Sequence, residues 1–230
     1  MRRLVALAVV GTVVVAGCGG GKSSPSATAG AKNDFASLVA KTNAATYKVT
    51  YQSGNDVPFT LSQQGREFSY VSGTSSTYVT ADGAAVSCSG TGPSATCASR
   101  PGGGDAVKQG LTSLFGALGT LFVTDAGRTI PGLSGISTTS GKQIAGRDAE
   151  CATIDSSSLG ALGAALGRGS YSVCVDTETG VMLSSKSDDG KGHVKQIVAT
   201  RFTEPTAADL TPPTKPQSLP SLTIPVPPST

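Results

Sequence analysis

The chain has 230 residues, and its 18 Lys and Arg residues barely exceed its 15 Asp and Glu residues. Two of these basic residues, Arg2 and Arg3, belong to an N-terminal segment that we expect to be removed. The remaining 16 against 15 give a net charge of +1, which leaves no basic patch and argues against nucleic-acid binding. Tryptophan is absent, aromatic residues make up 5% and glycine reaches 30 residues, a composition that favours a β-rich, turn-rich domain over a helical bundle.

The N-terminus has the parts of a secretory signal. Arg2 and Arg3 come first, an apolar run follows over residues 4–17, and small residues precede Cys18. The run is shorter than the roughly 20 residues that span a bilayer. The sequence Val-Ala-Gly-Cys ending at Cys18 resembles a bacterial lipobox, which implies cleavage before Cys18, a diacylglycerol on its thiol and an acylated amino terminus. We therefore expect a lipid anchor on the outer, extracytoplasmic face of the cell membrane. An ordinary secreted protein and a single-pass anchor are the alternatives.

A flexible tether and a first helix are expected next. Residues 18–33 are rich in Gly, Ser, Ala and Thr, a composition typical of flexible linkers. Asn33 or Asp34 can cap a helix, and Phe35, Leu38 and Val39 follow at i, i+3 and i+4. We expect this helix to end near Ala45.

Residues 47–100 have the pattern of an antiparallel meander. Tyr47, Val49 and Tyr51 alternate with polar residues, so they share one face of a strand. Turn residues separate this segment from several short strand-like segments that follow. The expected strands are residues 47–51, 57–63, 67–72, 76–80, 84–89 and 95–99.

The sequence Pro-Gly-Gly-Gly at residues 101–104 ends the meander, and Asp105 caps a second expected helix over residues 105–122. Its apolar residues form one stripe, which either simply covers the sheet or forms one wall of an apolar ligand cavity. Three interior glycines, each costing about 1 kcal/mol relative to alanine, suit a movable cover, but they also suit close helix–sheet packing. The candidate cavity residues are Leu111, Leu114, Phe115, Leu118 and Phe122.

The rest of the chain predicts a second group of strands and a tail. Residues 123–135 are loop-like, and residues 156–167 indicate a short, weak helix. The chain after Thr214 is Pro-rich and lacks a core pattern, so residues 214–230 are expected to be extended or disordered. The expected strands of this half lie within residues 136–145, 148–154, 171–175, 181–187 and 193–202.

Four cysteines besides Cys18 agree with export to an oxidising compartment. Four cysteines can pair in three ways. Pairing Cys88 with Cys97 and Cys151 with Cys174 joins neighbouring strand-like segments in each case, and we prefer it. Each bond would close a short loop and stabilise the fold by about 2–4 kcal/mol. A four-cysteine zinc site is the alternative, although the chain has no CxxC pair.

The sequence offers little that points to an enzyme. Its only histidine, His193, follows a turn and opens an expected strand, which fits an exposed turn residue better than a catalytic base. One histidine cannot build a His-based metal cluster. Residues 176–180 carry alternating acidic residues, but this segment is too short for an EF-hand loop and fits a β-turn better than a calcium site. We expect no enzymatic activity, no cofactor and no bound metal.

Three local motifs accompany this order of elements. Residues 144–151 (IAGRDAEC) and residues 174–183 (CVDTETGVML) each predict a strand with a turn, and residues 202–213 run from FTEP to DLTPP. Together with the signal, tether, helix and meander, they resemble the LolA/LolB-like lipoprotein superfamily, nearest the LppX/LprG-type lipoproteins of high-GC Gram-positive bacteria. The resemblance covers about residues 34–213. It implies an α+β fold in which helices cover the concave face of a strongly bent antiparallel β-sheet, a half-barrel.

The better-known members of this superfamily carry lipids or lipoproteins in an apolar cavity between sheet and helices, and they have no catalytic residues. The resemblance therefore implies that this chain binds or carries a lipidic or amphipathic ligand beside the membrane. The chain departs from the pattern because it lacks tryptophans and carries four cysteines and a Pro-rich tail. The alternative is a non-enzymatic envelope interaction or sensor module with a filled core, whose partner is an envelope protein.

Overall fold

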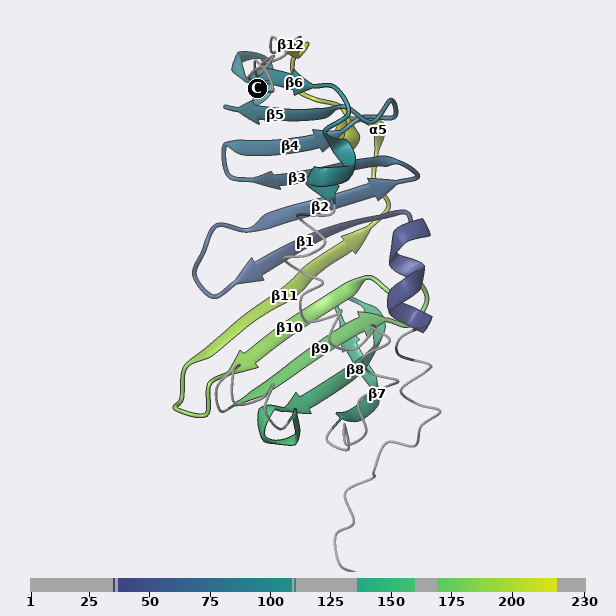
Figure 1. Ribbon diagram of the computed structural model, residues 1–230, viewed down its shortest axis with the longest axis vertical. Helices are drawn as coiled ribbons and strands as arrows, with labels where there is room; N and C mark the ends of the chain where they lie inside the picture. Colours follow the sequence, from purple (N-terminus) through teal and green to yellow (C-terminus); the bar gives the residue numbers. More distant parts are fainter. Residues whose placement is uncertain (1–34, 36, 109, 111–135, 160–168, 219–230) are drawn as a thin grey trace, which may run out of the picture.

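The computed structural model describes residues 35, 37–108, 110, 136–159 and 169–218. Within these residues, twelve strands form one sheet in the order β12-β6-β5-β4-β3-β2-β1-β11-β10-β9-β8-β7 (Figure 1). All neighbouring strands are antiparallel except β12 and β6, which are parallel. The strands are β1 (Tyr47–Ser53), β2 (Phe59–Gln64), β3 (Glu67–Ser72), β4 (Ser75–Val79), β5 (Ala85–Ser89), β6 (Thr96–Arg100), β7 (Ile136–Ile144), β8 (Arg147–Asp155), β9 (Ser170–Asp176), β10 (Met182–Asp188), β11 (Val194–Thr203) and β12 (Gln217–Ser218).

The first six strands form the expected meander, each pairing with the next. The alternating residues Tyr47, Val49 and Tyr51 of β1 are all buried, as their spacing predicts. Gly65 lies in the turn between β2 and β3 with φ +59, a left-handed backbone that glycine adopts without steric cost. The second strand begins two residues later than expected, since Pro58 has no N–H to donate to a neighbouring strand.

The other half of the sheet is strongly bent. β11 pairs with β1 and joins the meander to β10, β9, β8 and β7. In a flat sheet β7 and β11, which are four strands apart in this order, would be separated by about 19 Å. Instead, some of their Cα atoms approach within 8 Å. This half of the sheet is therefore rolled, which is consistent with the expected half-barrel.

Helices are few in the described residues. The first expected helix is present at residues 35 and 37–41 and continues into the 3-10 turn η1 (Thr42–Ala44). Another 3-10 turn, η2 (Gly92–Ser94), lies between β5 and β6. A third, η3 (Ser156–Leu159), stands where the weak helix is expected to begin. Residues 104–108 and 110 form the described start of the second helix.

The main core cluster lies on β1, β2 and β3 and continues onto β8–β11. A second cluster packs Phe35 of the first helix against β8 and β9. The helix therefore packs directly on the sheet. The fully buried members of the main cluster include Val49, Tyr51, Phe68, Val181 and Leu183.

After β11 the chain returns along the N-terminal half of the sheet to its far edge (Figure 1). It forms the short helix α5 (Ala207–Leu210), whose Leu210 is buried, and then β12 beside β6. The first residues of the expected tail thus lie on the sheet edge as far as Ser218. Residues 219–230 are outside the described residues.

Candidate functional site

A row of three aromatic side chains crosses the N-terminal half of the sheet. Tyr51 on β1 lies directly opposite Phe59 on β2, and their rings stack with centroids 5.0 Å apart. Tyr70 on β3 continues the row, with its ring centroid 5.8 Å from that of Phe59. Strand alternation produces this row. Tyr51 and Phe59 are directly paired, and Tyr70 is paired with Leu61, which lies two residues from Phe59 and so on the same face of β2.

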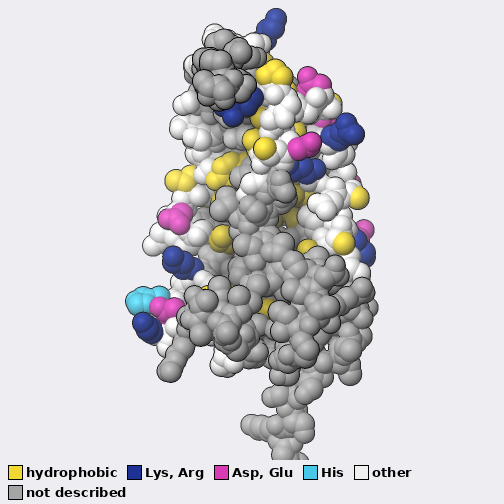
Figure 2. Space-filling model, viewed as in Figure 1, with side chains coloured by type: hydrophobic (Ala, Val, Ile, Leu, Met, Phe, Trp, Pro, Cys, Tyr) yellow, Lys and Arg dark blue, Asp and Glu magenta, His cyan; other side chains and the backbone are white. Residues whose placement is uncertain are grey.

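The aromatic row joins the protein core to its surface. Tyr51 is buried, whereas Phe59 and Tyr70 are half-buried and pack against the main core cluster. Val107, near the start of the second helix, packs against the same cluster. Hydrophobic side chains reach the surface over this half of the sheet (Figure 2). The half-buried rings of the row therefore expose apolar area while they pack against the core.

The polar atoms beside the aromatic row are neutral. The Tyr51 hydroxyl donates a hydrogen bond to the Met182 carbonyl oxygen at 2.7 Å, which ties β1 to β10. Burial, together with the nearby Tyr47, raises the pKa of Tyr51 well above its usual value. Burial alone raises the pKa of Tyr47 to about 12. Both phenols stay protonated at neutral pH, so this part of the sheet suits an uncharged or apolar group.

The first helix is held on the sheet by the side chain of Gln63. This residue is buried on β2, and its Nε2 donates to the carbonyl oxygens of Thr42, Asn43 and Ala45 at 3.0, 3.1 and 3.1 Å. These carbonyls belong to the end of a helix, where backbone oxygens lack partners within the helix. One amide therefore satisfies the helix end and fixes it to the meander.

The turn between β9 and β10 also contacts this helix. The Thr42 hydroxyl donates to the Gly180 carbonyl oxygen at 2.7 Å. Gly180 has φ +73, and a Cβ built there would lie 1.8 Å from the Leu38 carbonyl oxygen. Only glycine allows this approach of turn and helix.

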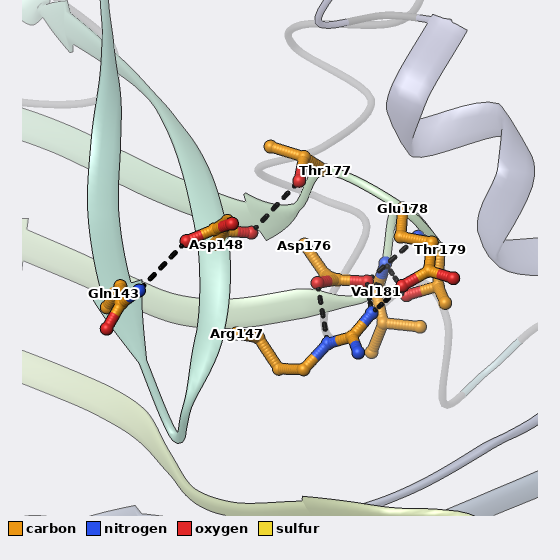
Figure 3. A network of polar contacts seen from close by, with 8 residues as sticks. All are labelled: Gln143, Arg147, Asp148, Asp176, Thr177, Glu178, Thr179 and Val181. Carbon is orange, nitrogen blue, oxygen red and sulfur yellow. Dashed lines mark hydrogen bonds and ion pairs between the residues drawn. The ribbon is translucent and has the colours of Figure 1, made fainter.

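A polar network shapes the same turn (Figure 3). Arg147 Nε and Nη2 donate to the two carboxylate oxygens of Asp176 at 2.9 and 3.0 Å, and Nη2 also donates to Glu178. Asp176 accepts further hydrogen bonds from the N–H and hydroxyl of Thr179 at 2.8 and 2.6 Å. The Arg147 guanidinium also lies 4.8 Å from the centre of the Phe202 ring. These contacts link β8, the turn and β11, and so they hold the turn in place.

The charge state of the network follows from its contacts. Burial by itself raises the pKa of Asp176, but hydrogen bonds from Arg147 and Thr179 outweigh it and hold the pKa below its usual value. The hydrogen bonds that Arg147 donates to Asp176 and Glu178 raise its pKa. The ion pair is therefore fully charged at neutral pH, and neither group is suited to exchange protons with a substrate.

The two preferred disulfides are confirmed. Cys88 and Cys97 are directly opposite on β5 and β6, and Cys151 and Cys174 are directly opposite on β8 and β9. Disulfide formation excludes the alternative of a four-cysteine zinc site.

The lipid-attachment residue and the predicted cavity residues lie outside the described residues. The structure therefore leaves untested the predictions for Cys18 and for Leu111, Leu114, Phe115, Leu118 and Phe122. In the part of the chain that the structure describes, no helix is long and apolar enough to cross a membrane.

The only histidine of the sequence is on an exposed hairpin (Figure 2). Its Nδ1 lies 2.7 Å from Asp189 Oδ2, and the side chain is 81% exposed. The described ranges contain no group of three or more His, Cys, Asp or Glu residues that could hold a metal ion. This position suits an exposed turn residue, as its sequence context predicts.

Sequence reasoning did not find the aromatic row or the Arg147–Asp176 pair. The alternation of β1 placed Tyr51 on a buried face, but the partners Phe59 and Tyr70 depend on the strand register. Arg147 and Asp176 are 29 residues apart and meet only because β8 and β9 are neighbours in the sheet. The signal that could have found this pair was one Arg and one Asp at the ends of the two strands that the disulfide joins.

No protein-family model matches the sequence, and no curated protein matches it. Among solved structures, the chain is similar to MucB, with 16% identity over 80% of this chain and a TM-score of 0.42. It is also similar to MucB in complex with MucA(peri), with 16% identity over 79% of this chain and a TM-score of 0.39. The Pseudomonas aeruginosa MucA/MucB complex matches at 16% identity over 79% of this chain, with a TM-score of 0.38.

These matches span 63%, 59% and 60% of the respective solved chains. Overlap of this extent assigns neither a family nor a function. The resemblance to LolA/LolB-like lipoproteins stays a prediction from the sequence motifs.

Proposed function

We propose that the protein is a membrane-anchored extracytoplasmic lipoprotein that binds or carries a lipidic or amphipathic ligand on the apolar side of its bent sheet. The observation that carries this proposal is the row of Tyr51, Phe59 and Tyr70, which brings apolar area from the core to the surface. An acyl chain buried there gains about 0.8 kcal/mol per CH₂ group, so a long chain needs few polar contacts.

The second helix is the proposed cover of this site. Val107 packs against the main core cluster, which supports a path for residues 105–122 across the apolar side of the sheet. On this proposal the stripe from Leu111 to Phe122 would face the aromatic row, as the resemblance to the LppX/LprG type implies. The ligand lies between stripe and row.

The tether gives the domain access to the membrane. A linker of 16 residues with the composition of residues 18–33 would reach at most about 55 Å, and its root-mean-square length would be about 22 Å. A domain on such a tether stays beside the outer face of the membrane, where lipids are at high effective concentration.

Binding is tested by native mass spectrometry of the exported chain after delipidation, with a phospholipid and a free fatty acid added separately. The proposal predicts a complex of defined stoichiometry that weakens at least ten-fold when Phe59→Ser and Tyr70→Ser are combined. Val194→Ser, at an exposed apolar position at the start of β11, is the control and leaves binding unchanged. Absence of binding by the folded chain would sink the proposal.

Anchoring is tested separately with Cys18→Ser. We expect loss of the thiol-linked lipid, with either release of an unacylated form or retention of the uncleaved precursor. Lipid that is still attached in this variant would contradict the role of Cys18.

The second candidate is a non-enzymatic envelope interaction or sensor module. Large side chains such as Tyr51, Phe68 and Leu183 are fully buried in the main core cluster, and such packing supports this candidate. In this case the partner is an envelope protein that contacts the outer surface. Crosslinking in intact cells would recover that partner, and delipidated protein would bind no lipid.

A further inference from the structure

Residues 204–218, here called the strap, run from the end of β11 to the opposite edge of the sheet. The middle of the strap is firmly fixed at α5. Leu210 is buried, Lys48 Nζ donates to Asp209 Oδ1 at 2.5 Å, and the Ser69 hydroxyl donates to the Asp209 carbonyl oxygen at 2.7 Å. The Asp209 carboxylate also accepts from the N–H and hydroxyl of Thr206 at 2.8 and 2.7 Å. These contacts tie the strap to β1 and β3.

The end of the strap has fewer contacts in the described residues. The Thr214 hydroxyl donates to the Ala95 carbonyl oxygen at 2.9 Å. Beyond it, β12 pairs with β6 at Gln217–Ala98 and Ser218–Ser99. Within the described residues, which stop at Ser218, β12 pairs with two of the five residues of β6.

The strand that receives β12 is itself held rigidly. Cys97 of β6 is joined to Cys88 of β5 by a disulfide. Both cysteines belong to a buried cluster with Tyr78 and Val86. The edge therefore combines a fixed acceptor strand with an occupant whose described pairing consists of Gln217 and Ser218. A strand edge presents backbone N–H and C=O groups to any chain that can pair with it.

We propose that the outer edge of β6 is a strand-addition site, that β12 is its built-in occupant, and that the site takes an extended, proline-containing polar peptide of a partner protein, parallel to β6. The chemistry of the ligand follows from that of the occupant. Residues 214–218 read Thr-Lys-Pro-Gln-Ser, and Lys215, Gln217 and Ser218 are exposed. Recognition therefore rests on the backbone and on the Thr214 hydroxyl, while proline keeps the segment extended. This site is separate from the aromatic row and does not depend on it.

A labelled peptide of residues 212–222 is the probe, measured by fluorescence anisotropy. Its binding is compared for the full chain and for a variant that ends at Thr211 and so keeps α5. We expect the shortened chain to bind the peptide at least ten-fold more tightly, because β12 no longer occupies β6. Equal affinity for both chains, or no binding to a shortened chain that is folded by circular dichroism, would overturn the proposal.

If the shortened chain does not fold, a full-length chain with substitutions in β12 tests the proposal instead. Gln217→Pro combined with Ser218→Pro removes both backbone N–H groups of β12 and should raise peptide affinity, with faster hydrogen exchange at the outer edge of β6. Gln217→Ala combined with Ser218→Ala keeps both N–H groups and should behave as the unaltered chain does. Self-association of the shortened chain without peptide binding would show that the edge takes a second copy, and this result also contradicts the proposal.

Discussion

Gly180, in the turn between β9 and β10, lies against the carbonyl oxygen of Leu38 in the first helix, so closely that a Cβ at Gly180 would be 1.8 Å from that oxygen. The Thr42 hydroxyl closes the same contact from the helix side, at 2.7 Å from the Gly180 carbonyl oxygen. The position of the helix on the sheet therefore depends on one residue without a side chain.

Gly180→Ala is expected to destabilise the protein by at least about 3 kcal/mol, because a positive φ costs about 1–2 kcal/mol and the methyl group also displaces the helix. Gly192→Ala is the matched control: its φ is +94, and an added Cβ meets nothing within 4 Å. The free energy of unfolding of the control should fall only by the cost of the positive φ. Urea unfolding compares the two, and equal losses would contradict the helix contact.

Gln63→Leu should cost about 2–4 kcal/mol of unfolding free energy. The substitution keeps the approximate size of the side chain but leaves three carbonyl oxygens at the end of the helix without their donor. Gln64→Leu, at the exposed neighbouring position, should change stability by less than about 0.5 kcal/mol. Hydrogen exchange in residues 37–41 should increase in the first variant alone.

Asp176→Asn should lower stability at pH 7 by about 2–3 kcal/mol, since it leaves Arg147 without its main partner. The native pKa of Asp176 is below its unfolded value of about 3.9. The contribution of its charge is therefore complete above the unfolded pKa and is lost as the pH falls through the native pKa.

The unaltered protein should consequently lose stability more steeply below about pH 4 than the Asp176→Asn variant does. Urea unfolding between pH 2.5 and 7, each value set to about 0.1 unit, measures both slopes. Asp148→Asn is the control, because the exposed Asp148 carboxylate accepts one side-chain hydrogen bond from Gln143 at 3.1 Å. Parallel acid slopes for the protein and Asp176→Asn would refute this role of Asp176.

The two disulfides should differ in their contribution to stability. Their sequence separations are 9 and 23 residues. Loop-closure entropy then assigns about 2.6 kcal/mol to Cys88–Cys97 and about 3.4 kcal/mol to Cys151–Cys174. Paired alanine variants of each bond, unfolded in urea, test this order. A larger loss from the Cys88–Cys97 pair would mean that packing in its cluster, and not loop closure, dominates.

Local patterns predicted the elements that depend on neighbouring residues. The alternation of Tyr47, Val49 and Tyr51 gave a strand with a buried face, and the cysteines lay in adjacent strand-like segments that pair directly. The contact of Arg147 with Phe202 was beyond reach, because it requires the bend that brings β8 near β11. A bend depends on how all strands pack together, so no single segment encodes it.

The strap shows a different limit. The Pro-rich sequence after Thr214 has no apolar periodicity, which is the signal for burial, and so it indicated a tail. Pairing of Gln217 and Ser218 with β6 needs only backbone N–H and C=O groups. Every residue except proline has both. Strand addition at an edge therefore leaves little trace in composition.

The central claim is that an apolar ligand lies on the row of Tyr51, Phe59 and Tyr70. The most direct measurement is photolabelling of the full-length, folded protein with a fatty acid that carries a diazirine on its acyl chain, followed by peptide mapping. The account predicts label on the peptides that contain Phe59 and Tyr70, with competition by unlabelled phospholipid. Label confined to other parts of the sheet, such as β10 and its hairpin to β11, or no specific label, would contradict it.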